Sequence, residues 1–311
     1  MKIFNSIQEF NTDARTIVTL GTFDGVHKGH KSILEKITSS SKKAGCENVL
    51  LTFFPHPRMV LQQNTDIKLL NTIREKAMLL EEYGIDNLII HPFDHSFSRL
   101  TAEEFVKDIL VDKLKVQKII IGYDHRFGRN RTANIDDLII FGKEYGFEVE
   151  QISALEINEV SVSSTKIRNA LNAGYLETAN RYLGYPYFLT GTVVKGKQLG
   201  RTIGFPTANI HITESYKLIP IKGVYVVSSE VKGQKVFGMM NIGNNPTVGG
   251  VAESIEVHFF NFNADIYNSE IRVNIHYRIR DEIKFPSVNH LKDQLMEDQK
   301  VSLDYISQKL S

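Results

Sequence analysis

Short apolar runs alternate with amphipathic helical patterns over the first half of the chain. The strand-length runs cover residues 17–20, 49–54, 87–90 and 118–121. Helical spacing marks residues 74–83 and 101–116, and the second of these segments starts with the capping-box pattern Thr101-Ala-Glu-Glu104. Strands that alternate with helices predict a parallel sheet covered by helices on both faces. Ligands of such sheets bind beyond the carboxyl ends of the strands, so chemistry is expected there.

The pattern changes near residue 184, where Gly184-Tyr-Pro-Tyr187 follows a helical segment that ends near Leu183. Beyond it, apolar, β-branched or alternating runs cover residues 187–194, 224–230, 235–240, 254–262 and 271–279. Short strands separated by Gly, Asn and Pro turns predict a small β-barrel, and the amphipathic segment Val288 to Leu310 predicts a closing helix. We therefore expect an α/β chain of two domains, residues 1–183 and 184–311.

Composition excludes several classes of protein. The 311 residues suffice for two domains, and 42% hydrophobic with 23% charged residues is ordinary for a globular protein. A formal net charge of +1 gives no global attraction to nucleic acid or anionic lipid. Cys46 is the only cysteine, so no intramolecular disulfide can form. With no signal-peptide core in residues 1–10 and no membrane-length apolar stretch, we expect a cytoplasmic protein without membrane or nucleic-acid partners.

The densest motif is GTFDGVHKGH, residues 21–30, which joins the first strand-length run to a helical pattern. Free N–H groups and the positive helix end suit a phosphate there. On the first helical turn His27 and His30 would lie on one side, and Gly29 would let a nucleotide approach the backbone. Neither the Walker spacing nor the dinucleotide fingerprint is present. A tight turn with two solvated histidines is the alternative, but three glycines and Asp24 in the same motif favour a phosphate site.

Three further segments have candidate chemistry. TFFPHPR, residues 52–58, offers an aromatic face, cations and two stiffening prolines, although a rigid loop with core phenylalanines explains it equally. GYDHRFG, residues 122–128, places glycine, an acid and an arginine after a strand, and a surface turn is its alternative. VSSTKIR, residues 162–168, gathers hydroxyls, a lysine and an arginine at a helix start, which forms an anion site or a solvated N-cap.

The barrel half has its own motif, which extends from Gly191 to Asn209. The glycines of residues 196–200 could form a loop over phosphates, with Lys197 or Arg201 as the countercharge. Thr207 and Asn209 offer the hard oxygens that Mg²⁺ accepts. Further along, Glu256 alternates with Ile255 and Val257, so it points to the opposite face. Such a carboxylate is usually solvated, but beside a phosphate loop it can take the proton of an attacking hydroxyl.

These motifs together resemble those of a known family. His27-Lys-Gly-His30 resembles the His-x-Gly-His signature of the nucleotidyltransferase superfamily, and GTFDGVHKGH resembles the start of the bacterial bifunctional riboflavin kinase/FAD synthetases. The segments TFFPHP, GYDHRFG and SSTKIR are similar to further elements of the adenylyltransferase half. GFPTAN, residues 204–209, resembles the signature of riboflavin kinases, and the Glu-x-His pattern at Glu256 matches the same family.

The resemblance implies a Rossmann-like FMN adenylyltransferase domain in the first half. His27 and His30 would be catalytic. ATP would be bound by Gly21, Phe23, Asp24, Gly29, Ser163, Ser164, Thr165 and Arg168. FMN would be bound by Phe53, Pro55, His56, Arg58, Tyr123, Asp124 and Arg126. Tyr123 and His125 stand where the family usually has phenylalanine, and Ala133 stands in place of a glycine.

For the second half the resemblance implies a riboflavin kinase barrel. Glu256 would be the base on the riboflavin 5′-hydroxyl, and Thr207 and Asn209 would hold Mg²⁺ bound to ATP. ATP would also contact Gly191, Gly196, Lys197, Gly200 and Arg201, and the flavin would contact Asn241 and Arg280. Asn261 replaces an aspartate that the family generally has.

The expected function is therefore phosphorylation of riboflavin to FMN and adenylylation of FMN to FAD, with riboflavin, FMN and ATP as the small-molecule partners. No protein partner is implied. The alternatives are a chain that has kept one activity only, or a flavin-binding carrier or regulator without enzymatic activity.

Overall fold

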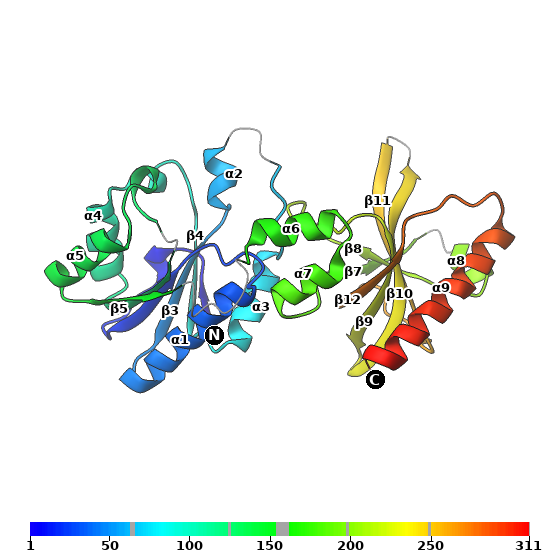
Figure 1. Ribbon diagram of the computed structural model, residues 1–311, viewed down its shortest axis with the longest axis horizontal. Coiled ribbons are helices and arrows are strands. Elements are labelled where there is room, and N and C mark those ends of the chain that lie inside the picture. The colour runs from blue at the N-terminus through cyan, green and yellow to red at the C-terminus, as the bar shows by residue number, and fades with distance from the viewer. Residues whose placement is uncertain (63–65, 124–125, 154–161, 197–198, 248–249, 311) are drawn as a thin grey trace. The chain divides into compact units, whose positions relative to one another are not determined.

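The computed structural model describes residues 1–62, 66–123, 126–153, 162–196, 199–247 and 250–310 (Figure 1). The chain divides into two compact units, Met1–Ser164 and Thr165–Ser311. Each unit has its own hydrophobic cluster, one on a face of a sheet and one where the C-terminal helix packs against a barrel. The fold class predicted from the sequence is confirmed in both units.

The first unit is built on a six-stranded sheet in the order β1-β4-β3-β2-β5-β6, in which every pair is parallel. Its strands are β1 (Lys2–Phe4), β2 (Thr16–Leu20), β3 (Asn48–Phe53), β4 (Asn87–His91), β5 (Val116–Gly122) and β6 (Glu148–Ile152). The four inner strands are the four predicted from apolar runs. The sequence analysis missed β1 and β6, which lie at the sheet edges and are short or carry polar residues at alternate positions.

Helices cover both faces of this sheet. They are η1 (Ile7–Glu9), α1 (Lys28–Ala44), α2 (Pro57–Leu61), α3 (Ile73–Glu82), η2 (Phe97–Arg99), α4 (Ala102–Glu104), the π-helical turn η3 (Phe105–Val111), η4 (Arg129–Arg131) and α5 (Ile135–Tyr145). Helix α1 packs against β2, β3 and β5. Side chains of η3 and α5 join alternate strand residues such as Val18 and Ile119 in a separate cluster, which places them on the opposite face.

The helix predicted over residues 101–116 starts as expected but ends earlier. The helix expected over residues 101–116 ends at Val111, because Val116 already pairs with Thr16 as the first residue of β5. Its start is as predicted, since Thr101 Oγ1 accepts from the Glu104 N–H and Glu104 accepts from the Thr101 N–H.

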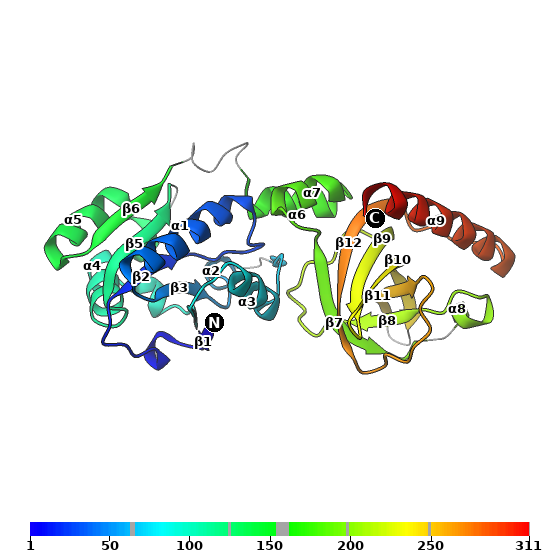
Figure 2. The same cartoon turned by 90° about the horizontal axis from the view of Figure 1, so that it is seen from below.

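The second unit is a closed barrel in the order β10-β11-β8-β7-β12-β9, whose strands pair antiparallel (Figure 2). Its strands are β7 (Phe188–Val194), β8 (Ala208–His211), β9 (Gly223–Val231), β10 (Gln234–Thr247), β11 (Gly250–Phe259) and β12 (Glu270–Arg280). Its helices are α6 (Ser164–Asn172), α7 (Leu176–Leu183), α8 (Leu199–Thr202) and α9 (Val288–Lys309). Ser164, the first residue of α6, is the last residue of the first unit. The barrel and the closing helix are both confirmed.

Helix α7 packs against the barrel. It contacts β12, and Nδ2 of Asn180 donates to the Ile275 carbonyl oxygen of that strand (2.9 Å). Oδ1 of Asn180 accepts from the N–H of Tyr187, the residue before β7 (2.7 Å). The boundary between the two compact units lies at the start of α6, so α7 belongs to the second unit. The functional boundary expected at residue 184 stays a prediction.

A buried ion pair fixes α9 to the barrel. Arg280 at the end of β12 donates from Nε to Asp298 Oδ1 (2.8 Å) and from Nη2 to Asp298 Oδ2 (2.6 Å). Asp298 is 1% exposed, so its charge is compensated almost entirely by this bidentate contact. Tyr305 of the same helix stacks on Tyr277 of β12, with ring centroids 4.8 Å apart.

We expect Asp298→Ala to destabilise the barrel by about 2–4 kcal/mol, because it leaves Arg280 without its buried counterion. Hydrogen exchange of the barrel amides in the full chain measures the loss. Asp304→Ala, which changes an exposed carboxylate of the same helix, is the matched control. Equal protection in the two variants would contradict the role given to the ion pair.

Candidate active sites

The turn after β2 lies where the strand order of the sheet reverses. Strands β3, β4 and β1 extend to one side of β2, and β5 and β6 extend to the other. In parallel sheets ligands bind at this switch point, beyond the carboxyl ends of the strands. The turn contains Gly21 to Gly25 and leads through His27, the N-cap residue, into α1. The expected strand–turn–helix context of the histidine motif is therefore present.

The two motif histidines stack on each other at the start of α1. Their ring centroids are 3.7 Å apart and the rings are 16° from parallel, so both lie on one side as their spacing predicted. The His27 backbone N–H donates to Nδ1 of His30 (3.3 Å). The His27 side chain is buried and that of His30 is partly exposed.

The protonation of His30 follows from this geometry. Burial lowers the pKa of His30 well below its ordinary value, and the charges of His27 and Lys76 lower it further. The ring is therefore neutral at pH 7 without ligand. Because Nδ1 accepts the bond from His27, the proton of the neutral ring is on Nε2. Nε2 of His30 is thus a hydrogen-bond donor.

Asp24 holds the turn from inside the protein. Its side chain is 1% exposed, and its Oδ1 accepts from the backbone N–H of Leu70 (2.9 Å). Its backbone carbonyl accepts from Oγ of Ser164 (2.9 Å). Asp24 and Ser164, two predicted ATP-site residues, are thus joined although they are far apart in the sequence.

The other predicted ATP-site residues fall into two groups. Phe23 and Gly29 are buried within or just after the turn, and a Cβ on Gly21 would lie 3.1 Å from the Phe23 ring. Ser163 precedes α6, while Thr165 and Arg168 lie on α6 in the second compact unit.

The predicted FMN residues follow β3 and β5, which flank β2 in the sheet. Phe53 ends β3 and packs near Phe93 and Phe97, with ring centroids 5.7 and 5.3 Å away. Pro55 follows a cis peptide bond, and His56 caps α2 by accepting from the Arg58 N–H through Nδ1 (3.1 Å).

At the end of β5, Tyr123 is 48% exposed and Arg126 is exposed, so both are accessible to a ligand. Asp124 and His125 lie outside the described residues. Ala133, which departs from the family pattern, is buried and exchanges backbone hydrogen bonds with Phe127 (3.1 and 3.2 Å).

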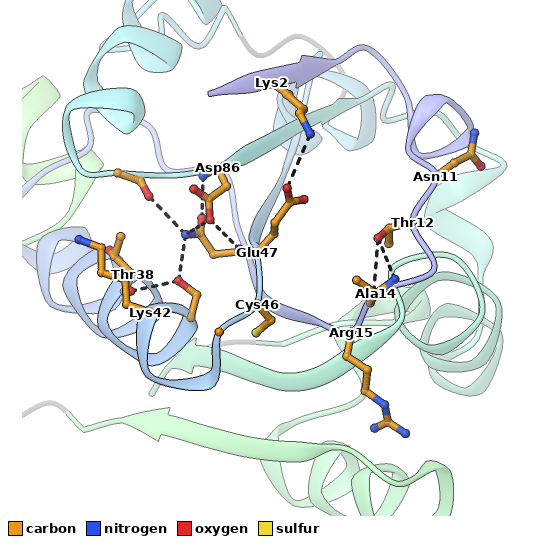
Figure 3. A pocket seen from close by; sticks show the side chains of 14 residues that line it. Lys2, Asn11, Thr12, Ala14, Arg15, Thr38, Lys42, Cys46, Glu47 and Asp86 are labelled. Carbon is orange, nitrogen blue, oxygen red and sulfur yellow. Dashed lines mark hydrogen bonds and ion pairs between the residues drawn. The ribbon is translucent and has the colours of Figure 1, made fainter.

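A pocket of about 670 Å³ lies elsewhere, at the amino ends of β2, β3 and β4 (Figure 3). Its polar side chains are engaged with one another: Asp86 Oδ2 accepts from Nδ2 of Asn48 (2.8 Å), and Lys2 pairs with Glu47 (3.6 Å). The motif residues lie at the other end of the strands, so this pocket is not the catalytic site.

In the barrel, the predicted catalytic residues form one row across three strands. Glu256 of β11 is directly opposite Asn209 of β8 and Asn241 of β10. Directly paired residues of antiparallel strands project to the same face. Thr207 adds a hydroxyl, which donates to Glu256 Oε2 (3.2 Å). The neighbours Ile255 and Val257 are buried on the other face, as the alternation predicted.

Close-packed glycines lie beside this row. A Cβ on Gly196 would approach Asn209 Nδ2 to 2.2 Å, and one on Gly200 would approach the Phe205 carbonyl oxygen to 2.1 Å. A Cβ on Gly191 would lie 2.6 Å from the His211 carbonyl oxygen. Arg201 is exposed on α8, and Lys197 lies outside the described residues. The flavin role of Arg280 stays a prediction; its guanidinium contacts Asp298 and the Asp281 carbonyl and lies over the Phe285 ring.

Comparisons with known proteins match both halves of the chain. A model of the FAD synthetase family matches residues 9–166, and a model of the riboflavin kinase family matches residues 183–306. A bifunctional riboflavin kinase/FMN adenylyltransferase of Buchnera aphidicola is 37% identical over 99% of this chain and 99% of the relative. The protein of the same name from Escherichia coli K12 is 36% identical over 93% of this chain and 92% of the relative.

The chain belongs to the bifunctional riboflavin kinase/FMN adenylyltransferase family. Among solved structures, one named as a macrolide-efflux protein from Streptococcus pneumoniae matches with a TM-score of 0.87 and 33% identity, over 96% of this chain and 97% of that chain. Every helix in the described part of this chain is too short or too polar to traverse a lipid bilayer.

The donor set in the barrel fits the Mg²⁺–ATP of a riboflavin kinase/FMN adenylyltransferase. Asn209 and Glu256 offer hard oxygens from adjacent strands, and Thr207 offers another just before β8. Because Gly196 has no Cβ, its backbone lies close to the Asn209 side chain. Among the described residues no cluster of three or more His, Cys, Asp or Glu side chains could hold a metal. A few protein oxygens plus substrate phosphates is the coordination that Mg²⁺ usually has.

The sequence analysis assigned no role to Lys76 or Thr52, whose side chains contact the Thr22 carbonyl oxygen in the turn before the histidines. Lys76 Nζ donates to the Thr22 carbonyl oxygen (2.7 Å) and lies 3.4 Å from Thr52 Oγ1. One signal was available: Lys76 is three residues after Ile73 and four before Leu80, so a charge occupies the apolar stripe of a helix.

Gly200→Ala is expected to lower riboflavin phosphorylation by about 10- to 100-fold, because the added methyl group displaces the Phe205 backbone two residues before Thr207. Rates of FMN formation from riboflavin and ATP measure this. FAD formation from supplied FMN, followed in the same variant, is the internal control and should not change. An unaltered kinase rate would contradict the close approach seen here.

Proposed function

We propose that this chain phosphorylates riboflavin in its barrel and adenylylates the resulting FMN in its sheet unit, giving FAD. The observation that carries the proposal is the presence of two separate sites, one built on the stacked histidines and one on the Glu256 row. Both family models match the corresponding parts of the chain. The relatives' names combine the same two activities.

In the barrel, Glu256 is the general base. It takes the proton of the riboflavin 5′-hydroxyl as that oxygen bonds to the γ-phosphorus of ATP, and the bond from this phosphorus to the β,γ-bridging oxygen breaks to release ADP. The Thr207 hydroxyl bonded to Oε2 orients the carboxylate. Asn241, which is directly opposite Glu256, would bind the flavin.

Thr207 and Asn209 would hold Mg²⁺ beside the ATP phosphates. The ion supplies neutralisation of phosphate charge. Gly196 and Gly200 allow the backbone to lie against the Asn209 side chain and the Phe205 carbonyl, and Arg201 offers a positive charge from α8.

In the sheet unit, an oxygen of the FMN phosphate bonds to the α-phosphorus of a second ATP, and the α,β-bridging bond breaks to release pyrophosphate. The attacking phosphate is largely ionised near pH 7, so no strong base is required. Alignment and stabilisation of the transition-state charge are required instead. His27 and His30 at the helix start, with the N–H groups of the turn, supply both.

A cytoplasmic location belongs to the proposal. It is supported by the single cysteine and by the ATP that both reactions consume.

The paired variants His27→Ala plus His30→Ala should lower FAD formation from FMN by at least about a hundredfold, because they remove donors aimed at the developing charge. Glu256→Gln should lower FMN formation by about 10²–10⁴-fold, because the base is gone while the shape is kept. Product time courses from riboflavin and from FMN measure each step.

Each variant is the control for the other. The histidine variant should accumulate FMN, and the Glu256→Gln variant should convert supplied FMN to FAD at the wild-type rate. Loss of the same step in both would overturn the proposed division between the two sites.

A further inference from the structure

Lys76 of α3 is a buried cation beneath the histidine turn. Its residue is 2% exposed, and its Nζ donates to the carbonyl oxygen of Thr22, which lies inside the turn (2.7 Å). Thr52, at the end of β3, donates from Oγ1 to the same carbonyl oxygen (3.2 Å). Two donors from different elements thus converge on one backbone oxygen of the turn that the catalytic histidines follow.

This turn requires support because its backbone is strained. Phe23 has φ = 45° and Val26 has φ = 36°, values that bulky and β-branched residues rarely adopt. Such conformations persist only where the surrounding structure fixes them. Lys76 holds the residue before Phe23, and Asp24 is held by the Leu70 N–H and the Ser164 hydroxyl. The contacts made from inside the protein therefore determine the path of the turn.

The charge of Lys76 also affects the pKa of His30. Burial lowers the pKa of Lys76 to about 8, against the opposing effect of the Asp24 carboxylate. Lys76 in turn lowers the pKa of His30, together with burial and with His27. The Asp24 carboxylate thus raises the pKa of Lys76, while His27 and Lys76 both lower the pKa of His30.

We propose that Lys76 is a positioning residue for adenylyl transfer, which holds the turn before the two histidines through the Thr22 carbonyl oxygen. The inference rests on the proposed role of the histidines. The positive charge of Lys76 has a second effect, because it adds to burial and to His27 in lowering the pKa of His30.

The test compares three variants in the full chain. Lys76→Met removes the bond and the charge, and Lys76→Gln keeps a donor without the charge. Thr52→Val keeps the charge but removes the second donor to Thr22 and the longer contact (3.4 Å) that Lys76 Nζ makes with Thr52 Oγ1. We expect Lys76→Met to lower kcat/KM for FAD formation from FMN by at least about tenfold, with a smaller loss for Lys76→Gln. Thr52→Val should stay near the wild-type value.

A second readout separates charge from tethering. In NMR titrations of the histidine rings, assigned through a His30→Gln spectrum, the pKa of His30 should rise in both Lys76 variants and stay unchanged in Thr52→Val. Lys107→Met, which changes an exposed lysine of the same unit, is the matched surface control. Wild-type kinase activity in every variant shows that the barrel is intact.

An unchanged His30 titration in both Lys76 variants, or full adenylyl transfer in Lys76→Met, would each overturn the inference. Retention of adenylyl transfer by the histidine variants would instead overturn the proposed function.

Discussion

The adenylyl-transfer site depends on buried polar groups that hold one strained turn. Phe23 and Val26 have left-handed backbone conformations, and the turn keeps them because Asp24 and the Thr22 carbonyl are bonded from β3, α3 and the segments around Leu70 and Ser164. All of these contacts are made within the protein, and such internal support is what a preorganised site requires.

The barrel site depends on strand register instead. Asn209, Glu256 and Asn241 face one another only because β8, β11 and β10 pair at these positions. A slip of one residue in any strand would turn its side chain to the other face. The buried residues Ile255 and Val257 oppose such a slip, since it would move them out of the core. The burial of Ile255 and Val257 thereby keeps Glu256 on the opposite face of β11.

Much of this was predictable from local pattern. The inner strands, the barrel, the closing helix and the positions of the glycine-rich motifs follow from periodicity and turn residues. The edge strands β1 and β6 were missed because a polar or short segment acquires strand structure only from its neighbour. Strand β8 was missed because its four residues overlap a motif whose glycines and proline indicate a loop.

The sequence by itself determined which residue types are present for phosphate chemistry and that His27 and His30 share a side of a helix, because three-residue spacing on a helix is a local property. Only the tertiary structure decided that Ser164 bonds to Asp24, that Asn241 faces Glu256, and that Lys76 lies under the turn. These pairs join segments distant in the chain, and their proximity arises from sheet order, register and burial, which no local pattern encodes.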